Sequence, residues 1–122
     1  EAHNVSLEIQ SEIEKMAKPG VAASEIYDLA FDIAKKAGFE ANFMGHRQKA
    51  GFIGHGVGIE LNEAPVFAPR SKDILAEGMV FALEPKFVIP QVGAVGIENT
   101  FVVTASGIEK LTQCEEGILP LD

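Results

Sequence analysis

Three side chains that could bind a metal lie inside apolar segments typical of β-strands. His55 lies in the glycine cluster GHGVG, Glu84 in MVFALEPKFVI, and Glu98 in GAVGIENTFVV. An ionised carboxylate in an apolar setting is costly unless it is paired or coordinates a cation. An imidazole together with carboxylates is a ligand set suited to Zn, Mn, Co or Fe. The residue types therefore indicate a metal site. The three residues lie far apart in the sequence, so they do not form a compact metal-binding motif. Each one alone also fits a solvent-facing position on a strand.

The composition of the chain excludes several classes of function. Its 122 residues are 47% hydrophobic, which suits one compact domain or one half of a larger domain. A formal net charge of −8 argues against nucleic acid as a partner, because phosphates would be repelled. No segment approaches the roughly 18 apolar residues of a membrane span. The single cysteine, Cys114, cannot form an internal disulfide, so we expect a reducing, cytoplasmic setting.

The elements that must position these side chains are helices in the first part of the sequence and strands in the second part. Apolar residues recur at three- and four-residue steps at the start of the chain, which predicts an amphipathic helix that ends at Pro19 and Gly20. The residues of its apolar stripe are Val5, Ile9, Ile13 and Met16. A second helix is expected to begin after Ser24 as N-cap and to end at Gly38. Because helical character begins with the first residues, we expect the chain to be a fragment.

The second part of the sequence is rich in Val, Ile and Phe. Four strands are predicted, at residues 51–61, 79–89, 94–104 and 108–112, with a loop at 65–72. Helices followed by antiparallel strands predict an α+β fold in which two helices pack on one face of a sheet. The other face of that sheet would be partly uncovered, which indicates a missing partner.

Three segments in a fixed order carry a resemblance to a known family. GHGVG followed by ELNEAP, then GMVFALEP, then GAVGIENTFVVTASGIEKLT, resemble the C-terminal half of the pita-bread metallopeptidases. This family contains methionine aminopeptidase, Xaa-Pro aminopeptidase, prolidase and the metal-free creatinase. The helical first part of the sequence, with KPGVAASEI, is also similar to the family's preceding segment, so the resemblance covers residues 1–122. It implies a catalytic domain of two similar halves, of which this chain is the C-terminal one and the N-terminal one is absent.

The resemblance also implies a role for each candidate residue. His55 matches a metal-ligating histidine, Glu84 a ligand of the same metal with a catalytic role in proton transfer, and Glu98 the glutamate that bridges two metals. The implied cofactors are two divalent ions, Mn, Co, Zn or Fe. The implied activity is that of a metal-dependent aminopeptidase or dipeptidase, of Xaa-Pro type, in which metal-activated water attacks the N-terminal bond of a peptide substrate.

Some residues depart from the family pattern. The family's two aspartate ligands precede this region, whereas Asp28 and Asp32 lie on the second helix and are interpreted as solvated. Asn62 stands in place of a histidine that contacts the substrate, and it can donate a hydrogen bond but cannot carry a proton in catalysis. Gly96 stands where several Xaa-Pro relatives have arginine. These departures leave open a divergent peptidase, an amidinohydrolase-like enzyme, or a non-catalytic pita-bread module that binds peptides or proteins.

We expect three properties of the chain by itself. It should be inactive as a peptidase and hold no metal ion or one. His55, Glu84 and Glu98 should converge in one pocket. The family halves are related by pseudo-twofold symmetry, so a second copy could replace the missing half. We therefore expect a homodimer whose interface uses apolar surface along strands 79–89 and 94–104.

Overall fold

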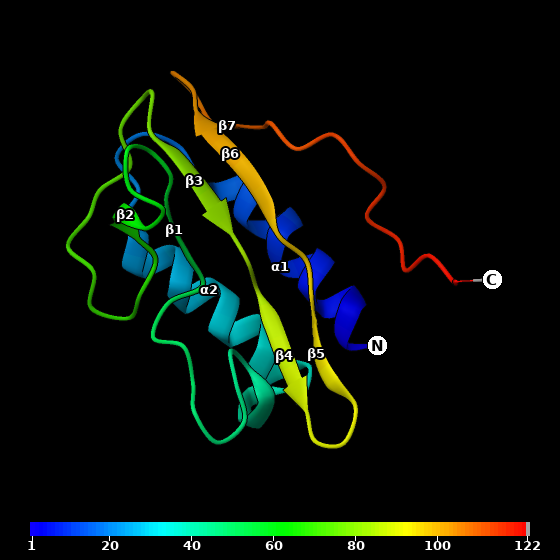
Figure 1. Ribbon diagram of the computed structural model, residues 1–122. Coiled ribbons are helices and arrows are strands. Elements are labelled where there is room, and N and C mark those ends of the chain that lie inside the picture. Colours follow the sequence, from blue (N-terminus) through cyan, green and yellow to red (C-terminus); the bar gives the residue numbers. More distant parts are fainter. Residues whose placement is uncertain (122) are drawn as a thin grey trace.

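The computed structural model describes residues 1–121 and has two helices covering one face of an antiparallel sheet (Figure 1). The expected α+β fold class is confirmed. The helices are α1 (Ala2–Met16) and α2 (Ala23–Lys36), followed by the short 3-10 helix η1 (Glu40–Asn42). The strands are β1 (Gly54–Gly56), β2 (Glu63–Val66), β3 (Val80–Leu83), β4 (Lys86–Ile89), β5 (Gly93–Gly96), β6 (Asn99–Val103) and β7 (Ile108–Lys110). One sheet has the order β2-β1-β3-β6-β7, and β4 pairs with β5 in a second.

Helix α1 packs on the sheet through the apolar stripe that the sequence predicts. Val5, Ile9 and Ile13 of α1 are buried. The start of α2 differs from the prediction, because its N-cap is Ala22 and no side chain caps it. The backbone N–H of Ala23 instead donates to the carbonyl of Asp73 at 2.9 Å. A neighbouring loop therefore accepts from one of the free N–H groups of the helix N-terminus, and the side chain of Ser24 does not cap it.

The predicted strands 79–89 and 94–104 are each interrupted, and this is the main correction to the expected sheet. Residues 79–89 form β3 and β4, and residues 94–104 contain most of β5 and all of β6. Pro85 has no N–H for a ladder, and Glu84 donates its N–H to Ile53 at 2.8 Å. Leu83 pairs with Asn99, and the register resumes with Lys86 opposite residue 96. The two interruptions therefore lie side by side.

The region before them is less regular than expected. Only three residues of the predicted strand 51–61 are in β1, and the predicted loop 65–72 contributes Pro65 and Val66 to β2. β2 is an edge strand, and there the missing backbone N–H of Pro65 is tolerated, because no second strand needs it as a donor.

A cluster of aromatic rings joins the sheet to the helices. The ring of Phe81 on β3 lies 4.8 Å from that of Phe67 and 5.6 Å from that of Phe101 on β6. All three side chains are fully buried, and each such burial stabilises the fold by about 1.5–3 kcal/mol. Because side chains alternate along a strand, this burial directs Glu84, three residues after Phe81, to the opposite face.

Exposed apolar side chains do not lie where we expected them. Within residues 1–121, the large exposed apolar residues fall in connections and in the C-terminal segment, and none lies in 79–89 or 94–104. They include Ile59, Leu61, Val92 and Leu119. In these segments β3 and β6 are interior strands with partners on both sides, whereas β4 and β5 are the two edges of their own sheet. The expected homodimer interface stays a prediction. In the described part of the chain, no helix is long and apolar enough to cross a bilayer.

Candidate metal centre

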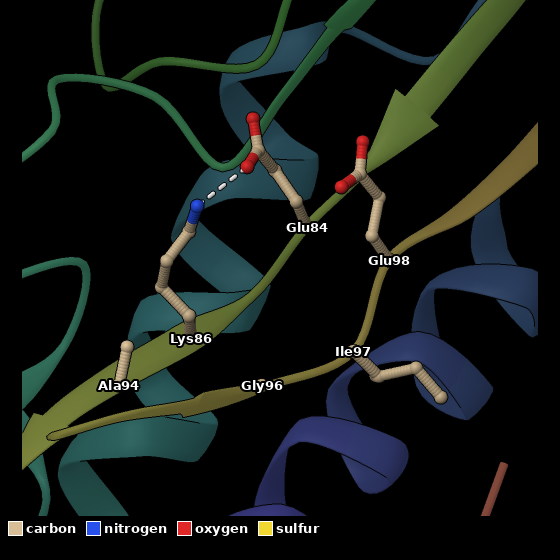
Figure 2. Close-up of a pocket in the computed structure, with 6 residues that line it drawn as sticks. All are labelled: Glu84, Lys86, Ala94, Gly96, Ile97 and Glu98. Atoms are coloured by element: carbon tan, nitrogen blue, oxygen red, sulfur yellow. Dashed lines mark hydrogen bonds and ion pairs between the residues drawn. The ribbon is translucent and has the colours of Figure 1, made fainter.

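The two strand interruptions bring Glu84 and Glu98 into one pocket. Figure 2 shows both carboxylates on the same side of the strands, whereas Ile97 points away from them. The pocket has a volume of about 200 Å³ and opens to solvent. It is lined by Glu84, Lys86, Ala94, Gly96, Ile97 and Glu98. Two carboxylates that lie 14 positions apart in the sequence are thus brought together by strand register.

His55 lies in the middle of β1, where it is 7% exposed, between β2 and β3. Its Nδ1 lies 3.0 Å from the carbonyl oxygen of Gly56. A carbonyl only accepts hydrogen bonds, so Nδ1 is the donor in this contact, and in the neutral ring Nε2 is the nitrogen with the lone pair. Nε2 lies 3.7 Å from Oε1 of Glu84. The imidazole is therefore held with its free nitrogen towards a carboxylate, which is the arrangement of a metal-ligating histidine.

The glycines around His55 allow neighbouring strands to approach closely. A Cβ at position 54 would lie 2.5 Å from the carbonyl oxygen of Ala82 on β3. A Cβ at position 56 would lie 2.2 Å from the carbonyl oxygen of Ala64 on β2. Side chains at these positions would push away the strands on either side of the histidine. The GHG sequence is thus explained by strand packing.

Glu84 has a partner for each of its carboxylate oxygens. Oε2 accepts a hydrogen bond from Nζ of Lys86 at 2.5 Å, and Oε1 faces His55. Lys86 is opposite Gly96 in the β4–β5 register, and a Cβ at position 96 would lie only 2.6 Å from the Cβ of Lys86. Lys86 was missed in the sequence, although its position two residues after Glu84 places both side chains on one face of an extended chain.

The carboxylate of Glu98 has different surroundings. It is exposed, and it takes part in none of the ion pairs found in residues 1–121. Within the same residues, no three His, Cys, Asp or Glu side chains lie close enough together to hold a metal ion. The described geometry thus joins His55 to Glu84, and Glu84 to Glu98 through the shared pocket.

His55 and Glu84 are spaced as two ligands of one divalent cation. Two ligands that each lie about 2.1 Å from a tetrahedral zinc ion are separated by about 3.4 Å. The 3.7 Å between Nε2 of His55 and Oε1 of Glu84 requires only a small adjustment. Asn62 is exposed in the connection between β1 and β2, and it does not line the pocket. Asp28 and Asp32 are exposed on α2, as the sequence predicts.

Two buried amides behind the pocket were also missed. Gln10 of α1 and Asn99 of β6 are each 2% exposed, and Nδ2 of Asn99 donates to Oε1 of Gln10 at 2.7 Å. Nδ2 of Asn99 also donates to Oε1 of Glu116 at 2.8 Å. The available signal was a glutamine beside Ile9 and Ile13 on the buried side of the helix, because a buried amide requires partners.

An ion pair holds the C-terminal segment against this region. Nζ of Lys110 donates to Oε1 of Glu116 at 2.6 Å and lies 3.6 Å from Oε1 of Glu14. The hydrogen bond from Lys110 is the main cause that lowers the pKa of Glu116, and the same bond raises the pKa of Lys110. Each charged form is stabilised by the other.

Comparison with known proteins decides the family. The model of metallopeptidase family M24 matches residues 1–105. The chain belongs to metallopeptidase family M24. This membership confirms the resemblance that the three ordered motifs carry.

Solved and curated M24 relatives cover nearly the whole chain. It is 37% identical over 119 residues to the Xaa-Pro dipeptidase of Pyrococcus furiosus, an alignment that covers 98% of this chain and 32% of the relative. The prolidase structure from Pyrococcus furiosus superposes with a TM-score of 0.84 at 36% identity, covering 93% of this chain and 32% of that one. For the Xaa-Pro dipeptidase from Bacillus anthracis, the TM-score is 0.86 at 32% identity, with coverages of 98% and 32%. The chain thus spans about a third of the length of these M24 relatives.

Proposed function

We propose that this chain is the C-terminal half of an M24 catalytic domain that hydrolyses the N-terminal peptide bond of Xaa-Pro substrates. In this proposal, His55, Glu84 and Glu98 are its metal ligands. The observation that carries the proposal is the orientation of His55, whose free Nε2 faces Glu84 at 3.7 Å while Nδ1 is bound to a backbone carbonyl. The presence of Glu84 and Glu98 in one pocket and the Xaa-Pro dipeptidase relatives give further support.

The residues of this chain would divide the catalytic work. Two divalent ions, Mn, Co, Zn or Fe, would supply polarisation of the scissile carbonyl and activation of a water molecule. Glu84 would accept the proton of the attacking water and deliver it to the leaving amine. Asn62 would donate a hydrogen bond to the peptide substrate, but it could not transfer a proton.

The proposed centre is incomplete in this chain. Three side chains cannot fill the coordination positions of two cations, and the remaining aspartate ligands would come from the other half of the fold. We therefore expect the chain by itself to hold one ion weakly, or none, and to hydrolyse no Xaa-Pro peptide. Peptide hydrolysis by the purified chain in the presence of Mn²⁺ or Co²⁺ would contradict this division between the halves.

A second copy of the chain is the proposed partner when the other half is absent. Ile59 and Leu61 project into solvent from the connection between β1 and β2, where a partner would cover them. Burial of such residues is favourable, and an isologous contact is the commonest way for identical chains to achieve it. Sedimentation at micromolar concentration tests this proposal. A monomer, or a dimer that Ile59→Ser and Leu61→Ser do not weaken, would refute it.

The sharpest test of the catalytic proposal is a chimera. The aligned part of this chain, 98% of its length, would replace the matching segment of the Pyrococcus furiosus Xaa-Pro dipeptidase. The relative would thereby provide the other half of the centre. We expect the chimera to bind divalent metal and to hydrolyse an Xaa-Pro dipeptide, and His55→Ala to abolish both properties. Lys36→Met, at the end of α2, serves as the matched control and should change neither.

The outcome separates the enzyme from the binding module. A folded chimera that binds metal but does not hydrolyse the dipeptide would favour the non-catalytic module. In that case Asn62→His tests whether the asparagine is the cause. Activity should return only if the lack of a histidine at position 62 is the sole defect. A folded chimera whose metal content is unchanged by His55→Ala would overturn the proposed ligand set.

A further inference from the structure

A single buried amide lies behind both interruptions of the sheet. Nε2 of Gln10 donates to the carbonyl oxygen of Leu83 at 3.0 Å and to that of Ile97 at 3.4 Å. Leu83 is the residue before Glu84, and Ile97 is the residue before Glu98. One side chain of α1 therefore binds the two strands at the points where the candidate ligands leave them.

The orientation of this amide is fixed by a third contact. Oε1 of Gln10 accepts a hydrogen bond from Nδ2 of Asn99 at 2.7 Å, so Nε2 must be the end that faces the two carbonyls. Asn99 is in turn held by Glu116. A buried amide with both ends bonded is costly to disturb, because any rotation leaves a polar group unpaired.

The covalent geometry of the peptide bond transmits this restraint to the carboxylates. A carbonyl lies in the same rigid plane as the nitrogen and Cα of the next residue. Holding the carbonyl of Leu83 therefore fixes the plane from which Glu84 departs, and holding that of Ile97 does the same for Glu98. The backbone supplies part of this restraint, because the N–H of Glu84 donates to Ile53 at 2.8 Å. Between the two strands that carry the carboxylates, however, the ladder is interrupted at both places.

We propose that Gln10 is a positioning residue of the metal centre, which sets the distance and orientation of Glu84 relative to Glu98. The inference rests on the proposed function, since the spacing of the two carboxylates matters to the chemistry only if both bind metal. By this proposal α1, which lies on the face of the sheet away from the two carboxylates, contributes to the metal centre.

The test compares Gln10→Met with Ser6→Ala in the purified chain. Methionine keeps the length and the packing of glutamine but removes its hydrogen bonds. Ser6 is the matched control, because it is buried on the same helix and its hydroxyl donates to Ala2 within α1. Gln10→Glu provides a second variant, which can still accept from Asn99 and, in its ionised form, cannot donate to the carbonyls.

Two measurements separate positioning from stability. The first is the backbone amide ¹⁵N shifts of Glu84 and Glu98, recorded without metal. The second is the affinity for Zn²⁺ by calorimetry, alongside thermal unfolding. We expect both Gln10 variants to move the two amide signals and to weaken Zn²⁺ binding by about 10- to 100-fold, as for loss of a residue that orients a ligand. Ser6→Ala should leave the signals and the affinity unchanged.

Failure of this inference is distinguishable from failure of the proposed function. If Gln10→Met and Gln10→Glu bind Zn²⁺ as tightly as Ser6→Ala, while His55→Ala binds it less tightly than the parent chain, the positioning role is overturned and the metal site stands. If Zn²⁺ binding is unaffected by His55→Ala, the proposed ligand set is overturned and the role of Gln10 with it. If the chain by itself holds no Zn²⁺, the same variants are compared in the chimera, where the same two outcomes decide.

Discussion

Glu84 and Glu98 lie at adjacent interruptions of two strands and share one pocket, yet their surroundings differ. The side chain of Glu84 is 18% exposed and contacts both Lys86 and His55. Glu98 is exposed and belongs to none of the ion pairs in residues 1–121. This chain therefore supplies the partners of Glu84. In the proposed function, those of Glu98 would come from the ions that it shares with the other half.

The comparison predicts the largest effect for the carboxylate of Glu84. Glu84→Gln should weaken Zn²⁺ binding by more than about 100-fold. Loss of a residue that only orients a ligand lowers metal affinity by about 10- to 100-fold, and loss of the ligand itself should lower it further. Calorimetry with the purified chain measures this. Glu12→Gln, on the surface of α1, is the control for loss of one negative charge. Equal affinities for the two variants would remove Glu84 from the centre.

Glu98→Gln is expected to have a smaller effect. A single ion held by His55 and Glu84 would lose only its third ligand, so we expect a loss of about 10-fold in Zn²⁺ affinity. Its thermal unfolding should match that of the parent chain, because an exposed side chain contributes little to stability. A loss as large as that of Glu84→Gln would mean that the two glutamates are equivalent ligands, which contradicts the comparison.

Lys86→Met should act in the opposite direction. The ammonium group of Lys86 occupies one oxygen of Glu84, so its removal should free that oxygen and raise Zn²⁺ affinity by about 3-fold, comparable to the loss of a weak ion pair. Lys36→Met removes the same charge far from Glu84 and controls for the overall charge of the chain. If both lysine variants bind Zn²⁺ alike, the contact between Lys86 and Glu84 does not compete with the metal.

The smallest effect concerns the C-terminal segment behind Glu98. The pKa of Glu116 is lowered in the folded chain, so its contribution to stability is present above the pKa of the unfolded state, near 4.5, and is lost as the pH falls through the folded value. We expect the free energy of unfolding, measured with urea, to decline less steeply below pH 4.5 in Glu116→Gln than in the parent chain. Glu115→Gln, at the exposed neighbouring position, should retain the full acid dependence.

The pKa of Lys110 gives the opposite sign at alkaline pH. It is raised above 10.5, so the contribution of Lys110 to stability is complete below that pH and is lost as the pH rises through the folded value. The acid prediction also has an outcome that contradicts it. If the free energy of unfolding of Glu116→Gln falls in acid as steeply as that of the parent chain, the ion pair does not stabilise the fold.

The sequence by itself determined the helices, the fold class and the family. Apolar residues at three- and four-residue steps are enough to define the buried stripe of α1, because helix periodicity is a local property. Ordered motifs around His55, Glu84 and Glu98 were enough to indicate metallopeptidase family M24, because the residue types of a site are written directly in the chain. The assignment of these three residues as ligands stays a prediction.

Only the tertiary structure decided how these residues are arranged. The sequence predicted unbroken strands through Glu84 and Glu98, since local β-propensity contains no information about where a ladder stops. The register that places Lys86 opposite Gly96 depends on the pairing of two strands. The bonds from Gln10 to Leu83 and Ile97 join residues 73 and 87 positions apart. Such contacts form only when the helix packs on the sheet, and so no local pattern could reveal them.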